Sequence, residues 1–120
     1  MRVLLIDDDE AVRTMLADTL AEEGIEVDGL ANAEDALILL AAGQVPDVLV
    51  ADVNLGGGLT GFDLADIARS RHPDLEVILI SGSAPLPAGH ALQRHERFLA
   101  KPFAPDDLAR EIRAAAAEAL

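Results

Sequence analysis

Acidic, hydroxyl and ammonium side chains follow four separate apolar runs of this 120-residue chain. In chain order they are Asp7, Asp8, Asp9, Asp52, Ser81 and Lys101. Carboxylates that lie a few Å apart resist joint ionisation, and a hard divalent cation removes that conflict. Mg²⁺ binds one or two carboxylates and leaves its other positions to water and phosphate oxygens. With a hydroxyl and an ammonium for the remaining oxygens, the set predicts phosphoryl transfer, in which a carboxylate can be the nucleophile.

These side chains can act together only if the runs before them are neighbouring strands of one sheet. Strands are predicted at residues 3–6, 25–30, 48–51, 77–80 and 98–100. Three of these runs, at 3–6, 48–51 and 77–80, are continuously apolar, which is typical of parallel strands buried on both faces. The run at 25–30 alternates between apolar and polar residues, which indicates a more peripheral strand.

Helical periods separate the predicted strands. The first helix is expected to end at Gly24, and the second to begin after Asn32 as its cap and end at Gly43. A third helix is predicted at about residues 62–71, and the last begins near Pro105, a residue that suits a first helical turn.

Between the fourth and fifth strands, Pro85, Pro87 and Gly89 predict that any helix is short or irregular. Five strands alternating with roughly five helices predict an α/β fold with a doubly wound parallel sheet, covered on both faces. Ligands of such sheets bind outside the carboxyl ends of the strands. The polar residues that follow the strands are therefore expected to share one edge of the sheet.

Composition narrows the class of protein further. Nine basic and 22 acidic residues give a net charge of −13, which argues against direct binding of nucleic acid. The absence of cysteine excludes disulfides and zinc–thiolate sites. No apolar run approaches the roughly 20 residues of a membrane span, and the start lacks a secretory signal, so a cytoplasmic protein without membrane association is expected. The length predicts one domain, residues 1–120.

Four motifs, in this order and spacing, resemble the receiver domain of two-component response regulators. They lie at residues 5–9, 50–52, 80–82 and 98–103, and the resemblance extends from about Arg2 to Ala117. It implies a flavodoxin-like three-layer α/β/α sandwich with the strand order 2-1-3-4-5. It also implies a phosphorelay protein that takes a phosphoryl group from the phosphohistidine of a histidine kinase or phosphotransfer domain and signals to a downstream protein target.

The resemblance assigns roles to four residues around a Mg²⁺ ion. Asp52 corresponds to the phosphoacceptor. Asp8 corresponds to a direct metal ligand, and Asp7 to one that acts largely through water. Asn54 stands where a main-chain carbonyl completes the metal shell. Asp9 has no family role, and we expect it to cap a helix.

The resemblance also assigns a switch. Ser81 corresponds to the hydroxyl that moves onto the phosphoryl group, and Lys101 to the lysine that pairs with it. A cis peptide before Pro102 is implied as well. Phe98 corresponds to the aromatic side chain that turns inward when the hydroxyl moves, and the surface formed by residues 84–100 is expected to change with it. Catalysis is limited to the domain's own phosphorylation and autodephosphorylation, so the chain is not expected to be an enzyme in the usual sense.

Three features depart from the family pattern. Gly56 stands where the family commonly has proline, and the loop between Asp52 and Gly61 is one residue longer than usual. Residues 84–97 are short and broken by prolines where receivers usually carry a regular fourth helix. By analogy, this favours a stand-alone receiver or one attached to a hybrid histidine kinase, present as a monomer or weak dimer.

Other classes of function remain as alternatives. Asp7, Asp8 and Asp9 also fit the start of a haloacid-dehalogenase-type phosphatase, but that hypothesis leaves Asp52 unexplained. A second alternative is a receiver-like interaction module that signals without phosphorylation. A flavin or dinucleotide site is disfavoured, because acids occupy the place of a phosphate-binding glycine loop. The histidines, His72, His90 and His95, are expected to be surface residues.

Overall fold

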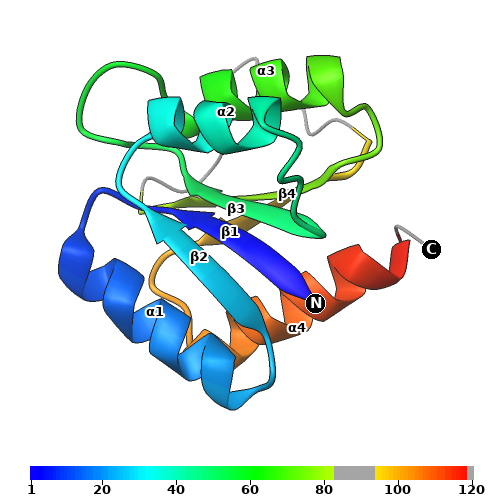
Figure 1. The fold of residues 1–120 in the computed structure, drawn as a ribbon. Coiled ribbons are helices and arrows are strands. Elements are labelled where there is room, and N and C mark those ends of the chain that lie inside the picture. The colour runs from blue at the N-terminus through cyan, green and yellow to red at the C-terminus, as the bar shows by residue number, and fades with distance from the viewer. Residues whose placement is uncertain (83–93, 119–120) are drawn as a thin grey trace.

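A computed structural model describes residues 1–82 and 94–118 of the chain. A five-stranded parallel sheet in the order β2-β1-β3-β4-β5 lies between two layers of helices (Figure 1). The strands are β1 (Arg2–Ile6), β2 (Glu26–Leu30), β3 (Val48–Asp52), β4 (Glu76–Ser81) and β5 (Glu96–Ala100). The described helices are α1 (Glu10–Glu22), α2 (Ala33–Ala41), α3 (Gly61–Arg71) and α4 (Pro105–Glu118). The predicted fold class and strand order are confirmed.

Each face of the sheet has its own apolar core, because successive strand residues point to opposite faces. Helices α2 and α3 cover one face, and α1 and α4 cover the other (Figure 1). In β1, Leu4 and Ile6 pack toward α2 and α3, whereas Val3 and Leu5 pack toward α1 and α4. Burial on both faces explains why the central strands are continuously apolar. The predicted short or irregular helix after β4 falls within residues 83–93, outside the described part of the chain.

Side-chain caps fix where three helices begin. Asp9 accepts a hydrogen bond from the N–H of Val12 at the start of α1, and Asn32 accepts one from Asp35 at the start of α2. Both caps were expected from the sequence. Thr60 forms a reciprocal capping box with Asp63, so α3 begins at Gly61, one residue before the predicted start.

Strands β4 and β5 begin earlier than predicted, at two buried glutamates. Glu76 opens β4 and Glu96 opens β5, and a charged residue does not indicate a buried strand. Both carboxylates have partners: Glu96 binds Arg69 of α3, and Glu76 Oε1 lies 2.5 Å from Nδ1 of His95. The prediction that His95 is a surface residue is therefore wrong, because its side chain is only 14% exposed.

The described helices are short and amphipathic. Within residues 1–82 and 94–118, none has the length and apolar character needed to cross a bilayer.

Candidate functional site

Three acidic side chains meet at the edge of the sheet formed by the carboxyl ends of the strands. Asp7 directly follows β1, Asp8 comes next, and Asp52 is the last residue of β3. One carboxylate oxygen from each lies within 4.8 Å of the other two. Asp7 and Asp52 are buried, whereas Asp8 is exposed. The carboxylates are close because β1 and β3 are neighbours in the sheet, so the sequence prediction of a shared edge is confirmed for these residues.

One carboxylate oxygen of Asp7 accepts a hydrogen bond, whereas the other accepts none from the described residues. Its Oδ1 accepts a hydrogen bond of 2.9 Å from the N–H of Asp9, and its main-chain carbonyl accepts one of 2.7 Å from the guanidinium of Arg13. Its Oδ2 is buried and has no hydrogen-bond partner among the described residues. A buried carboxylate oxygen left without a partner is costly unless a ligand completes the site.

Burial raises the pKa of the Asp7 carboxyl above its usual value, and the nearby Asp52 and Asp8 carboxylates raise it further. The hydrogen bond from Asp9 and the charge of Lys101 act in the opposite direction, but they do not outweigh burial. Ionisation of the Asp7 carboxyl in the folded protein is thus less favourable than in water.

Lys101 supplies the positive charge at this edge. Its Nζ lies 2.6 Å from Oδ2 of Asp52 and 3.7 Å from Oδ2 of Asp7, so the first contact is a hydrogen-bonded ion pair and the second is longer than a hydrogen bond. Burial alone would lower the pKa of Lys101, but the hydrogen bond and charge of Asp52, with the charge of Asp7, raise it. The ammonium therefore stays charged beside Asp52.

The loop after β3 is folded by hydrogen bonds that begin at Asp52. Oδ1 of Asp52 accepts from the N–H of Asn54, and Oδ1 of Asn54 accepts from the N–H of Gly56. Gly56 has φ +82°, a conformation that proline cannot adopt. A Cβ at Gly56 would also lie 2.9 Å from Oδ2 of Asp8. The glycine that departs from the family pattern is therefore required by this loop conformation.

The predicted switch residues lie on β4 and β5. Ser81 is the buried last residue of β4, and its carbonyl accepts a hydrogen bond from the N–H of Lys101. The Lys101–Pro102 peptide is cis, as the resemblance implied. Phe98 lies on β5, opposite Leu79 of β4, and packs half-buried against the core on the α2 and α3 side. The structure thus brings Ser81 and Lys101 to the edge of the sheet and places Phe98 in the middle of β5.

The sequence did not predict two contacts that support this edge. Arg13 of α1 reaches the carbonyl of Asp7, and Glu34 of α2 accepts a hydrogen bond of 3.3 Å from the N–H of Leu59 in the loop after β3. The contact of Arg13 had a weak signal in the sequence, because Gly29 lies inside a predicted strand. A glycine within a strand often marks a close approach by another group.

The donor set fits a hard divalent cation. Oxygens of three carboxylates lie close together, and Oδ2 of the buried Asp7 accepts no hydrogen bond among the described residues. Oxygen ligands of this kind are those that Mg²⁺ prefers. The acidic cluster could therefore bind a metal ion, with Asp7, Asp8 and Asp52 as the residues that would hold it.

Comparison with known proteins identifies the family to which the chain belongs. The chain matches the response regulator receiver domain family over residues 3–113. It belongs to that family, whose role is in signalling, and the alternative of a haloacid-dehalogenase-type phosphatase is set aside.

Individual relatives agree with this assignment. The chain is 36% identical over 104 residues to the response regulator protein FleR of Pseudomonas aeruginosa, covering 85% of this chain and 22% of FleR. It is 36% identical over 115 residues to the C4-dicarboxylate transport transcriptional regulatory protein DctD of Rhizobium meliloti, covering 94% of this chain and 25% of DctD. The chain thus spans about a quarter of the length of these relatives.

Solved structures show the same fold. A response regulator receiver protein from Sinorhizobium medicae superposes with a TM-score of 0.92 at 24% identity, over 100% of this chain and 97% of that one. NtrX from Brucella abortus superposes with a TM-score of 0.85 at 29% identity, over 98% of this chain and 27% of NtrX.

Proposed function

We propose that residues 1–120 form one receiver domain in which Asp52 accepts a phosphoryl group from the phosphohistidine of a histidine kinase or phosphotransfer domain. Mg²⁺ would be held by Asp7, Asp8, Asp52 and the main-chain carbonyl of Asn54. One observation carries the proposal: a carboxylate oxygen of Asp52 lies within 4.8 Å of oxygens of Asp7 and Asp8, and Oδ2 of Asp52 lies 2.6 Å from the Lys101 ammonium. This arrangement suits a carboxylate that must acquire further negative charge.

Each residue has a separate task in the transfer. An oxygen of Asp52 attacks phosphorus, and the bond from phosphorus to the imidazole nitrogen breaks as the acyl phosphate bond forms. When bound, Mg²⁺ neutralises charge on the phosphoryl oxygens. Lys101 exchanges its contact with the free carboxylate for one with a phosphoryl oxygen, and Ser81 donates a hydrogen bond to another. Ser81 is the last residue of β4, which pairs with β3, and Lys101 directly follows β5 and already contacts Asp52, so neither needs a large movement of the backbone.

The phosphorylated state is read out through β4 and β5. Movement of the Ser81 hydroxyl toward Asp52 leaves space beside Leu79 and Phe98, which face each other in the β4–β5 register. Phe98 is half-buried and can turn into that space. The surface next to β5 then changes, and a downstream protein target detects the difference.

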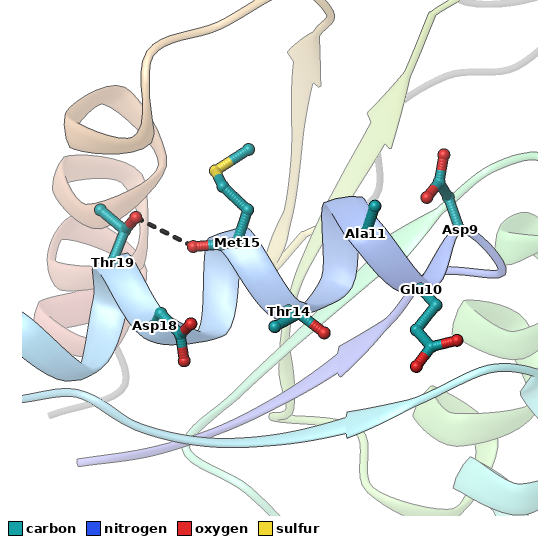
Figure 2. Close-up of a pocket in the computed structure, with 7 residues that line it drawn as sticks. All are labelled: Asp9, Glu10, Ala11, Thr14, Met15, Asp18 and Thr19. Atoms are coloured by element: carbon teal, nitrogen blue, oxygen red, sulfur yellow. Dashed lines mark hydrogen bonds between the residues drawn. The ribbon is translucent and has the colours of Figure 1, made fainter.

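An apolar groove next to Lys101 supports docking of a phosphodonor protein. It has a volume of about 210 Å³ and is lined by Val12, Met15, Leu16, Lys101, Pro102 and Phe103. Met15 is 47% exposed. A pocket on α1 is lined by the acids Asp9, Glu10 and Asp18 together with Thr14 and Met15 (Figure 2). A donor helix with an apolar stripe and basic flanks would complement this side of the molecule.

The test is covalent phosphorylation by acetyl phosphate with Mg²⁺, followed by intact-mass measurement. We expect one phosphoryl group per chain, labile to hydroxylamine. Asp52→Asn should abolish the adduct, because an amide is not a nucleophile. Asp18→Asn is the matched control, since it removes the same charge from the exposed face of α1 (Figure 2).

Two results would contradict the proposal. An adduct that persists in Asp52→Asn would place the acceptor elsewhere. If the wild type forms no adduct with acetyl phosphate or with a phosphorylated histidine phosphotransfer domain, the chain is a receiver-like module that signals without phosphorylation.

A further inference from the structure

Arg13 lies beneath the acidic edge without being part of it. It is a half-buried residue of α1, and its guanidinium donates a hydrogen bond of 2.7 Å to the carbonyl of Asp7. Among the described residues, no carboxylate lies within 4.0 Å of this guanidinium. Its contact with the site is therefore a hydrogen bond to the main chain and not an ion pair.

The aliphatic part of the Arg13 side chain lies in space that is open because residue 29 of β2 is glycine. A Cβ at Gly29 would lie 3.0 Å from Cγ and 3.1 Å from Cδ of Arg13. Glycine weakens a strand interior, so its presence needs a packing reason. Here Gly29, which is paired with Leu5 of β1, leaves the space in which the Arg13 stem lies.

The peptide that Arg13 holds is the one between Asp7 and Asp8. On the preceding side, the N–H of Asp7 donates to the carbonyl of Leu30 at the end of β2. On the following side, the carbonyl of Asp7 has the guanidinium of Arg13 as its partner. Hydrogen bonds on both sides thus hold the main chain that carries the Asp7 and Asp8 side chains.

We propose that Arg13, seated on Gly29, is a positioning residue that preorganises Asp7 and Asp8 for Mg²⁺. This inference rests on the proposed function of the acidic edge as a magnesium site. Fixing a site before binding improves affinity, because less conformational freedom is lost when the ligand binds. Removing the Arg13 donor should therefore weaken metal binding without changing the chemistry of the bound state.

The first experiment separates the donor from the stem. Arg13→Met keeps the apolar stem over Gly29 but has no donor, whereas Arg13→Lys keeps a donor. We expect Arg13→Met to weaken Mg²⁺ affinity about 3- to 10-fold in titration calorimetry, as for the loss of one hydrogen bond. Arg13→Lys should stay closer to the wild type. Arg110→Met is the matched control, since Arg110 is an exposed residue of α4 that pairs with Asp107.

Two further readouts distinguish positioning from general destabilisation. In the metal-free protein, amide hydrogen exchange at Asp8 should be faster in Arg13→Met than in the wild type, beyond any change in global stability measured by urea unfolding. At saturating Mg²⁺, the rate of phosphorylation by acetyl phosphate should stay within about two-fold of the wild type, because the bound arrangement is unchanged.

A double-mutant cycle tests whether the position of Arg13 depends on the space at Gly29. Gly29→Val should weaken Mg²⁺ binding in the wild-type background, because the new side chain displaces the Arg13 stem. In an Arg13→Ala background the same change should have no further effect, since the stem is gone. Additive losses would overturn the proposed route from Gly29 through Arg13.

The outcomes separate this inference from the proposed function. If the wild type binds no Mg²⁺, the metal site itself is wrong. If the wild type binds Mg²⁺ and Arg13→Met binds it equally well, the site stands and the positioning role is overturned. An Arg13→Lys variant as weak as Arg13→Met would overturn the role of the donor in the same way.

Discussion

The three carboxylates of the site have very different environments. Asp52 is buried and hydrogen-bonded to Lys101, Asp8 is exposed, and Asp7 is buried with one oxygen that accepts no hydrogen bond among the described residues. The cost of keeping a negative charge in the metal-free protein therefore falls mainly on Asp7. A cation that binds Asp7 removes this cost, which ties the stability of the fold to occupancy of the site.

At the scale of this residue, we predict that Asp7→Asn stabilises the metal-free protein. Burial raises the folded-state pKa of Asp7, so the group favours folding when protonated, and that stability is lost as pH rises through the folded pKa. The amide avoids the loss. In thermal unfolding with a chelator, Asp7→Asn should melt higher than wild type at pH 7, and the gain should shrink toward about pH 4, near the unfolded pKa.

Asp18→Asn serves as the control for Asp7→Asn, because it removes one charge from an exposed position. Excess Mg²⁺ should narrow the difference between Asp7→Asn and the wild type. A lower melting temperature for Asp7→Asn at pH 7 would show that the carboxylate contributes net stability.

At the scale of elements, the end of β3 and the start of α3 are in close contact. A Cβ at Gly61, the first residue of α3, would lie 2.4 Å from the carbonyl oxygen of Asp52 and 2.9 Å from Cα of Val53. These are backbone atoms, so no side-chain rotation can relieve the clash. Strand β3 and helix α3 are thus joined through a position at which only glycine fits.

We predict that Gly61→Ala destabilises the protein by about 1–3 kcal/mol, the usual cost of overpacking. The measurement is urea unfolding. Phosphorylation of Asp52 should also slow, because the strand end that carries it must shift. Gly57→Ala is the control, since a Cβ there meets nothing within 4 Å. An effect of Gly61→Ala no larger than that of Gly57→Ala would show that the contact relaxes freely.

The strand pair β4 and β5 provides the test of switching. Ser81→Ala should still accept a phosphoryl group at Asp52, but the surface change should be lost, because the hydroxyl that moves is absent. The measurement is the change in amide chemical shift at residues 94–100 on adding a beryllofluoride mimic. Equal changes in the wild type and in Ser81→Ala would contradict coupling through the hydroxyl. Residues 84–93, which complete the surface named in the sequence analysis, lie outside the described part of the chain.

Much of this architecture is predictable from the sequence, because apolar runs and caps act locally. The continuous runs predicted the buried strands, and the strand-end rule predicted that Asp7 and Asp52 meet. The early starts of β4 and β5 were not predictable, since Glu76 and Glu96 are buried only by virtue of partners on other elements. The packing of Arg13 against Gly29 was not predictable either, because it depends on how α1 packs against β2, which no local pattern specifies.

At the scale of the whole molecule, the net charge of −13 is spread over a body with a radius of gyration of 12.9 Å. Charge of one sign on a compact body opposes folding through self-repulsion. We predict that the melting temperature rises when KCl increases from about 10 to about 150 mM, because the Debye length falls from roughly 30 to 8 Å. Thermal unfolding in a chelator measures this effect. A fall in melting temperature would mean that attractive pairs, such as Lys101 with Asp52, dominate.

Met1 and the α4 residues Ala116 and Ala117 line one hollow, so the start of the chain lies beside the last turns of α4, at the end of the sheet away from the acidic edge (Figure 1). A polypeptide joined to the chain there would be attached on the side of the molecule opposite the acidic edge. The molecule measures 34 × 31 × 25 Å, so even a straight tether needs about eight to ten extended residues to reach the front. For a phosphodonor fused to this domain, linker length would thus set the effective concentration at Asp52, and a short linker would exclude transfer within one chain in favour of transfer between chains.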